Sequence, residues 1–215
     1  MKRLVLPRLY VILDAALLTV PETECAEKLV GAGVRLLQYR NKRASARELY
    51  ESSKRLSSLL VPQGVTFVVN DRADVALAAE TSGVHVGQED LGVEAARFVI
   101  GPGKLVGLST HNLEQFQAAA ATSADYIAVG PVFSTSTKAN PDPVVGIEFI
   151  RRVRSQTDKP IVAIGGITLE RAAEVIQAGA DSVAVISDIL LAPEPGQRAR
   201  QYVELLDAAN QAAAV

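Results

Sequence analysis

Eight short apolar runs recur along this chain of 215 residues, and they limit its fold more than any other feature. Most of the runs are rich in β-branched and aliphatic residues without polar alternation, a pattern typical of strands covered on both faces. In chain order they are LYVILD (9–14), VRLLQYR (34–40), TFVVN (66–70), GVHVG (83–87), LVGLST (105–110), YIAVG (126–130), PIVAIGG (160–166) and SVAVIS (182–187).

Most connections between the runs carry the spacing of amphipathic helices. The connection after the 34–40 run has apolar and small residues four, three and four positions apart, which places them on one helix face. These residues are Leu49, Ser53, Leu56 and Leu60. The stretch 169–176 shows a similar face through Leu169, Ala172, Ala173 and Ile176. Thr168 precedes it as an N-cap residue, and Gly179 follows it where a helix-ending glycine belongs.

Eight alternations of strand and helix predict parallel β/α units, and in 215 residues they fit a compact (β/α)8 TIM barrel. We expect one domain over residues 1–215. A doubly wound open sheet is the alternative fold. It is disfavoured because no G-x-G-x-x-G follows the first run and no P-loop sequence occurs, the GPGK at 101–104 having the wrong spacing.

The composition of the chain excludes some classes of binding partner. The formal net charge of −2 and the pI of 5.8 give no basic surface for a nucleic acid, so neither DNA nor RNA is expected. The single cysteine, Cys25, excludes an internal disulfide and favours a cytoplasmic protein. Arg8 and Asp14 interrupt the apolar N-terminal stretch, which predicts a strand there and no signal peptide.

No apolar run approaches the roughly 20 residues that a membrane span needs, so no membrane partner is expected. We expect small-molecule substrates instead. The sequence does not set the oligomeric state, and a homo-oligomer is left open.

Polar residues gather at the carboxyl ends of the expected strands. In a TIM barrel these ends and the loops after them form the active site, so we expect the side chains on one rim. The candidates are Gln38, Arg40, Lys42, Asn70, Asp71, Gln88, Glu89, Asp90, Ser109, His111, Lys138, Gly165, Gly166, Ile186 and Ser187.

This rim combines both signs of charge. Its cations are Arg40, Lys42 and Lys138, and its carboxylates include Asp71 and Asp90 on neighbouring loops. Cations alone would suit an anion, which the carboxylates would repel. Mg²⁺ reconciles the two, because one or two carboxylates typically hold it together with waters and phosphate oxygens. The pattern therefore predicts a metal-bound diphosphate, and arginine–aspartate pairing across the rim is the alternative.

A second anion site is expected after the last two strands. Gly165 and Gly166 allow backbone N–H groups to approach an anion, and a short helix is expected to begin after SVAVIS. Phosphate sites in this fold often use these two loops. Glycines needed only for a tight turn are the alternative. The long connection GPVFSTSTKANPDPVVG (130–146) is typical of an active-site lid, although a surface loop would share its composition.

The chain has two histidines. His85 lies in the middle of an expected strand and is expected to be a satisfied core or rim residue. His111 follows Ser109 by two positions, but GLSTH is not the G-x-S-x-G sequence of a hydrolase. We expect Ser109 to donate a hydrogen bond to a phosphate or a leaving group.

Seven motifs follow one another at the ends of all the expected strands except the first. They are QYRNK (38–42), NDR (70–72), HVGQED (85–90), GLSTH (107–111), GPVFSTSTK (130–138), AIGGI (163–167) and VAVIS (183–187). Together, in this order, they resemble the thiamine phosphate synthase family over nearly the whole chain. The chain departs from the family pattern at Ser134, where proline is frequent, and at Asn41, where an acidic residue is common.

The resemblance implies a Mg²⁺-dependent transferase that joins 4-amino-2-methyl-5-hydroxymethylpyrimidine diphosphate to a thiazole phosphate, giving thiamine phosphate and diphosphate through a carbocation. It implies that Gln38, Arg40, Lys42, Asn70, Ser109 and Lys138 hold the pyrimidine diphosphate, with Arg40, Ser109 and Lys138 catalytic. It also implies that Asp71 and Asp90 bind Mg²⁺ and that Thr135, Ser136, Thr137, Gly166, Ile186 and Ser187 seat the thiazole phosphate.

Three alternatives are weighed against this function. A thiazole tautomerase-like barrel would be expected to lack the acidic pair, because it has no diphosphate to hold. A phosphosugar isomerase or epimerase gives no reason for QYRNK together with two added acids. A non-catalytic barrel that binds a phosphate ligand would have no physical need for the whole charged rim.

Overall fold

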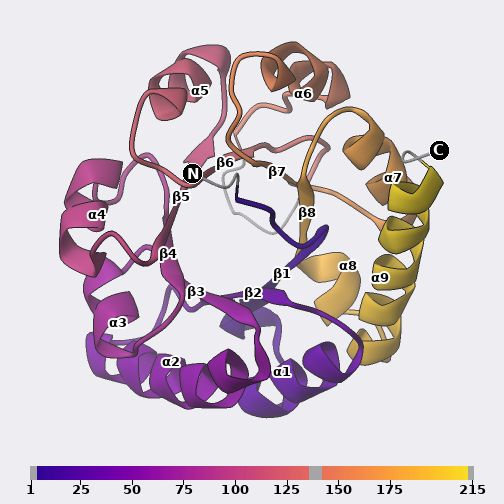
Figure 1. Ribbon diagram of the computed structural model, residues 1–215. Helices are drawn as coiled ribbons and strands as arrows, with labels where there is room; N and C mark the ends of the chain where they lie inside the picture. The colour runs from indigo at the N-terminus through magenta and orange to yellow at the C-terminus, as the bar shows by residue number, and fades with distance from the viewer. Residues whose placement is uncertain (1–3, 136–141, 213–215) are drawn as a thin grey trace.

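The computed structural model, which describes residues 4–135 and 142–212, contains a closed barrel of parallel strands in sequence order (Figure 1). The predicted (β/α)8 TIM barrel is confirmed, and each expected run contains its strand. The strands are β1 (Leu9–Asp14), β2 (Leu36–Arg40), β3 (Thr66–Asn70), β4 (Gly83–Val86), β5 (Leu105–Thr110), β6 (Tyr126–Val129), β7 (Ile161–Ile164) and β8 (Ser182–Val185).

Helices surround the barrel (Figure 1). They are α1 (Glu22–Gly31), α2 (Ala46–Leu60), α3 (Ala73–Ala78), α4 (Val93–Ile100), α5 (Leu113–Ala120), α6 (Ile147–Arg154), α7 (Leu169–Gln177), α8 (Ser187–Leu190) and α9 (Pro195–Ala212), with short 3-10 helices at Ala15–Leu17 and Val61–Gln63. Among the described helices, none is both long enough and apolar enough to cross a membrane.

The predicted helix signals are present in the structure. The expected face of α2 is buried along its whole length, and Ser45 and Glu48 form a capping box at its start. Thr168 is the N-cap residue of α7, and Gly179 follows the C-cap with a φ of +111°. A left-handed φ of this kind strongly favours glycine, which explains why the helix ends there.

Apolar residues form two cores. The larger core lies between the strands and the helices, and the smaller one fills the barrel interior with side chains such as Ile12, Leu36 and Val162. Leu6 packs against the inner core from the segment before β1. Figure 1 shows this indigo segment crossing the centre of the ring of strands. The segment therefore covers the inner core at the amino ends of the strands.

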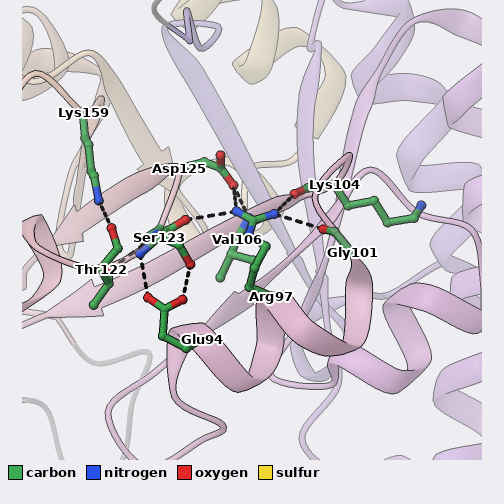
Figure 2. A network of polar contacts seen from close by, with 10 residues as sticks. Glu94, Arg97, Gly101, Lys104, Val106, Thr122, Ser123, Asp125 and Lys159 are labelled. Atoms are coloured by element: carbon green, nitrogen blue, oxygen red, sulfur yellow. Dashed lines mark hydrogen bonds and ion pairs between the residues drawn. The ribbon is translucent and has the colours of Figure 1, made fainter. Parts of the chain in front are cut away.

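Charged side chains connect the amino ends of neighbouring strands (Figure 2). Asp125, the residue before β6, accepts a hydrogen bond of 2.7 Å from the Val106 N–H at the start of β5. The same carboxylate pairs with Arg97 of α4. Arg97 also donates to the carbonyl oxygens of Gly101 and Lys104, so one guanidinium joins a helix end to two strands.

The same arrangement recurs two β/α units later. Asp181, the residue before β8, accepts 2.8 Å from the Ile161 N–H of β7 and 2.6 Å from Arg154 of α6. Ser82, the residue before β4, has the same position with an uncharged side chain, and its hydroxyl accepts a hydrogen bond of 3.0 Å from the Phe67 N–H of β3. Side chains placed just before β4, β6 and β8 thus satisfy amide groups of the strands that precede them, where the ladder would leave these groups unpaired.

Replacement of Asp125 by alanine is expected to lower the free energy of unfolding by about 2 kcal/mol, because the Val106 N–H loses its acceptor and Arg97 loses its carboxylate partner. Urea denaturation would measure this change. Asp207→Ala removes an exposed carboxylate on α9 and serves as the matched control, with an expected change within about 0.5 kcal/mol. Equal stabilities of the two variants would show that the Asp125 contacts contribute nothing.

Candidate active site

The carboxyl ends of the strands bring most of the predicted site residues to one rim. Gln38 and Arg40 come from β2, Ser109 from β5, and Ile186 and Ser187 lie where β8 passes into α8. Thr135 is the last described residue before the gap in the β6–α6 connection. Lys138, Ser136 and Thr137 lie outside the described residues, so their predicted roles stay predictions.

Arg40 pairs with a residue that the sequence reasoning missed. Its guanidinium donates to Asp14, the last residue of β1, whose side chain also accepts 3.0 Å from the Ala16 N–H. Asp14 is only 3% exposed. The pairing is the arginine–aspartate alternative left open above, although with a different aspartate. An acidic residue that closes the otherwise apolar LYVILD run was the available signal.

Asp71 and Asp90 lie side by side on the loops after β3 and β4. Asp71 pairs with Lys42 at 2.5 Å, and Asp90 accepts 2.8 Å from the Gly87 N–H. Burial raises the pKa of Asp71, Lys42 acts against that rise, and the Asp90 carboxyl within hydrogen-bonding reach adds to it. Asp71 also has a φ of +64°, an unusual value for a residue other than glycine and one often found at functional sites.

This pair fits a divalent cation. Two neighbouring carboxylates repel each other when both are ionised, and a hard cation between them would relieve that repulsion. Among the residues that the structure describes, no group of three or more His, Cys, Asp and Glu side chains gathers for a metal. A Mg²⁺ site needs only one or two protein carboxylates, because waters and phosphate oxygens supply the other ligands.

The glycines after β7 support a tightly packed turn. Gly165 and Gly166 have φ values of +99° and +62°. A Cβ atom on Gly165 would lie 2.4 Å from Pro131 Cβ, and one on Gly166 would lie 2.3 Å from the Ser134 carbonyl oxygen. The Phe133 N–H donates to the Gly165 oxygen at 3.0 Å. The turn therefore needs glycine for its packing against the β6–α6 connection, and the anion-binding role stays a prediction.

A chain of buried polar side chains crosses the barrel interior below the rim. Gln38 Nε2 lies 2.7 Å from the Tyr10 hydroxyl oxygen, which lies 3.1 Å from the Tyr126 hydroxyl oxygen. His85 contacts Tyr126 through Nδ1 at 3.0 Å and Ser109 Oγ through Nε2 at 2.8 Å. The prediction that His85 is a satisfied buried residue is confirmed.

Tyr10 and Tyr126 were missed because they stand inside apolar runs. In a strand buried on both faces, the sequence does not tell which alternate residues face the barrel interior. The one sequence feature that points to Tyr126 is Gly107, a glycine inside the neighbouring strand. In the structure, a Cβ atom at Gly107 would lie 2.1 Å from the Tyr126 ring. This glycine therefore makes room for a large side chain from the next strand.

His111 has partners on the β6–α6 connection. Its Nδ1 lies 2.6 Å from the Gly130 carbonyl oxygen, and its Nε2 lies 3.5 Å from Asp142. The hydrolase pairing with Ser109, disfavoured from the sequence, has no support in these contacts. His111 instead joins the end of β5 to both described parts of the connection.

Comparisons with known proteins give one consistent family. The family model described as thiamine monophosphate synthase matches residues 9–189. A thiamine-phosphate synthase from Koribacter versatilis is 53% identical over 208 residues, covering 94% of this chain and 96% of that protein. A thiamine-phosphate synthase from Archaeoglobus fulgidus is 44% identical over 183 residues, covering 85% of this chain and 86% of that protein.

Solved structures agree. The thiamine phosphate pyrophosphorylase from Pyrococcus furiosus has a TM-score of 0.86 at 35% identity, covering 94% of this chain and 96% of that chain. The phosphoribosyl anthranilate isomerase from Thermotoga maritima has a TM-score of 0.69 at 18% identity, covering 93% of this chain and 99% of that chain. At 18% identity, the similarity to this isomerase shows a shared fold and nothing more.

Replacement of Asp14 by alanine is expected to lower the free energy of unfolding by about 3 kcal/mol, because Arg40 loses its partner in a largely buried position. Denaturant titration of Asp14→Ala, Arg40→Ala and the double variant would measure the coupling. We expect the double variant to be less destabilised than the sum of the single variants. Additive losses would mean that the two side chains do not depend on each other.

Proposed function

The chain belongs to the thiamine monophosphate synthase family, and we propose that it joins 4-amino-2-methyl-5-hydroxymethylpyrimidine diphosphate to a thiazole phosphate. The products are thiamine phosphate and diphosphate. Membership of the family makes the chain a transferase of thiamine biosynthesis. The substrates, the metal and the residue roles given below are proposals.

The observation that carries the proposal is the pair of facing carboxylates beside a lysine. Asp71 and Asp90 lie next to each other, and Lys42 contacts Asp71 at 2.5 Å. This combination suits a diphosphate that shares a cation with the acids, as argued above. It also argues against a thiazole tautomerase-like barrel, which has no diphosphate to hold.

Six side chains are proposed to hold the pyrimidine diphosphate. Arg40 can remain paired with Asp14 while it binds, because a guanidinium carries five N–H donors in a rigid fork. Asp14 would thereby orient the remaining donors toward the substrate. The six residues are Gln38, Arg40, Lys42, Asn70, Ser109 and Lys138.

Asp71 and Asp90 are proposed to hold Mg²⁺, with the substrate oxygens and waters completing its ligands. The ion would neutralise part of the charge on the diphosphate leaving group. The Gly87 N–H, 2.8 Å from Asp90, fixes the direction of that carboxylate. Lys42 would lie beside the same oxygens through its contact with Asp71.

The thiazole phosphate is proposed to bind between the loops after β6, β7 and β8. The positive φ values of Gly165 and Gly166 turn this backbone sharply after β7, and α8 begins after the neighbouring strand β8, an arrangement that supports an anion site in this fold. The proposed contacts are Thr135, Ser136, Thr137, Gly166, Ile186 and Ser187.

The proposed reaction is dissociative. The bond between the pyrimidine methylene carbon and the diphosphate oxygen breaks first, and its electron pair leaves with diphosphate. The electron-rich aminopyrimidine stabilises the resulting carbocation until the lone pair of the thiazole nitrogen forms the new C–N bond. Arg40, Ser109 and Lys138 are proposed as catalytic residues, because they stabilise charge that grows on the leaving group. No protein nucleophile is required.

We also propose a cytoplasmic location, on the strength of the single buried cysteine and the small-molecule chemistry. A homo-oligomer is compatible with the proposal, but the proposed site does not need a second subunit. All proposed contacts come from one chain.

The direct experiment is diphosphate release by the purified protein mixed with both substrates, first with Mg²⁺ and then with EDTA. We expect release that needs both substrates and the metal, with thiamine phosphate as the coupled product. Release that persists in EDTA would contradict the metal assignment. Binding of either ligand without release would identify the tautomerase-like or the non-catalytic barrel.

Replacement of Asp90 by alanine is expected to slow turnover by at least about tenfold, equivalent to about 1.4 kcal/mol of barrier, because a proposed metal ligand is lost. Steady-state rates across a Mg²⁺ titration would measure the effect. The adjacent Glu89 is exposed, so Glu89→Ala is the matched control and should keep the wild-type rate. Wild-type rates of Asp90→Ala at limiting Mg²⁺ would remove Asp90 from the site.

A further inference from the structure

The buried chain from Gln38 to Ser109 joins two proposed substrate contacts through three residues that have no role in the proposed function. These residues are Tyr10, Tyr126 and His85, and each makes hydrogen bonds to both of its neighbours in the chain. The bonds that join Gln38, Tyr10, Tyr126 and His85 are buried, and the last bond, from His85 to Ser109, is partly buried and reaches the rim. A buried polar network of this kind has a fixed direction when every member is satisfied.

The direction follows from counting hydrogens. The Gln38 side-chain amide donates to the Tyr10 oxygen at 2.7 Å. The Tyr10 hydroxyl hydrogen then has one acceptor among its described contacts, the Tyr126 oxygen at 3.1 Å. Tyr126, which accepts that bond, donates its own hydrogen to His85 Nδ1. Both tyrosines stay neutral and keep their hydrogens, because burial raises the pKa of Tyr10 to about 12 and the pKa of Tyr126 well above 10.0.

From these contacts we infer that His85 is a positioning residue, held in the tautomer that carries its hydrogen on Nε2. Its Nε2–H then donates to Ser109 Oγ at 2.8 Å. Ser109 has a single hydroxyl hydrogen, and this hydrogen is left to point toward the rim. The inference rests on the proposed function, in which Ser109 donates to the diphosphate oxygens.

The opposite direction of the hydrogen bond between His85 and Ser109 would prevent Ser109 from donating to the diphosphate. If His85 Nε2 accepted from Ser109, the serine would present only lone pairs to an anionic leaving group, and the two would repel each other. The chain therefore makes Ser109 a dedicated donor before the substrate arrives. Such preorganisation helps most where negative charge grows in the transition state.

Packing holds the geometry in place. The His85 and Tyr126 rings are stacked with centroids 5.6 Å apart and planes 25° apart. Tyr10 and Tyr126 meet edge to face, at 6.1 Å and 79°. Gly107 leaves the space that the Tyr126 ring fills. The imidazole consequently has little freedom to rotate away from Ser109.

The tautomer can be measured on the wild-type protein without substrate, by ¹⁵N NMR of the histidine rings. The chain has two histidines, and they should differ. His111 must carry its hydrogen on Nδ1, because the Gly130 carbonyl oxygen 2.6 Å away can only accept. His85 should carry its hydrogen on Nε2. A His85 ring protonated on Nδ1, alone or together with Nε2, would overturn the inference.

A double-mutant cycle tests whether His85 acts through Ser109. His85→Phe keeps a ring against Tyr126 but removes the donor, and we expect kcat to fall by about tenfold with a smaller change in KM for the pyrimidine diphosphate. In a Ser109→Ala background, His85→Phe should cause no further loss. Equal losses in both backgrounds would show a merely structural role and overturn the inference.

His85→Gln is the conservative control. A glutamine amide can place an N–H donor near the position of the imidazole Nε2, so kcat should recover to within about threefold of the wild-type value. Recovery no better than that of His85→Phe would count against donation to Ser109. A wild-type protein that releases no diphosphate would instead refute the proposed function, and the NMR result would still report the tautomer.

Discussion

Closure of the parallel sheet into a barrel is the constraint on which the rest of the structure depends. Closure places the carboxyl ends of all eight strands on one rim, so side chains distant in the sequence become neighbours. It also encloses an interior filled by buried side chains, in which Tyr10 and Tyr126 meet although 116 residues separate them. The charged rim and the buried hydrogen-bonded chain are both consequences of this geometry.

The two cations described on the rim are each held by a carboxylate. Arg40 is paired with Asp14, and Lys42 with Asp71. These pairs fulfil the alternative in which arginine and aspartate neutralise each other, and they are also compatible with ligand binding. An oriented guanidinium loses less conformational freedom when an anion arrives than an unpaired flexible one does. The same contacts therefore serve stability and preorganise the proposed diphosphate site.

Much of the fold could be predicted from the sequence, because apolar runs of strand length alternate with helical faces such as that of α2. The rim followed from the fold, since polar residues came directly after the runs. Asp14, the partner of Arg40, had a signal in the sequence as the acidic end of an apolar run, but nothing there named its partner. The roles of Tyr10 and Tyr126 could not be predicted, because the inward residues of a strand buried on both faces have no polar alternation to mark them. The spacing of Gly165 and Gly166 indicated a turn, but only the structure shows its packing against Pro131 and Ser134.

The carboxylate–guanidinium links at the amino ends of the strands recur with nearly equal sequence separations, 28 residues for Arg97 and Asp125 and 27 for Arg154 and Asp181. They lie on the face of the barrel opposite to the rim. Substitutions there change the stability reserve of the protein without touching the groups proposed for chemistry. Substitutions that raise the free energy of unfolding can therefore arise on one face of the barrel. The added stability can offset loop substitutions on the other face that change specificity but destabilise the fold.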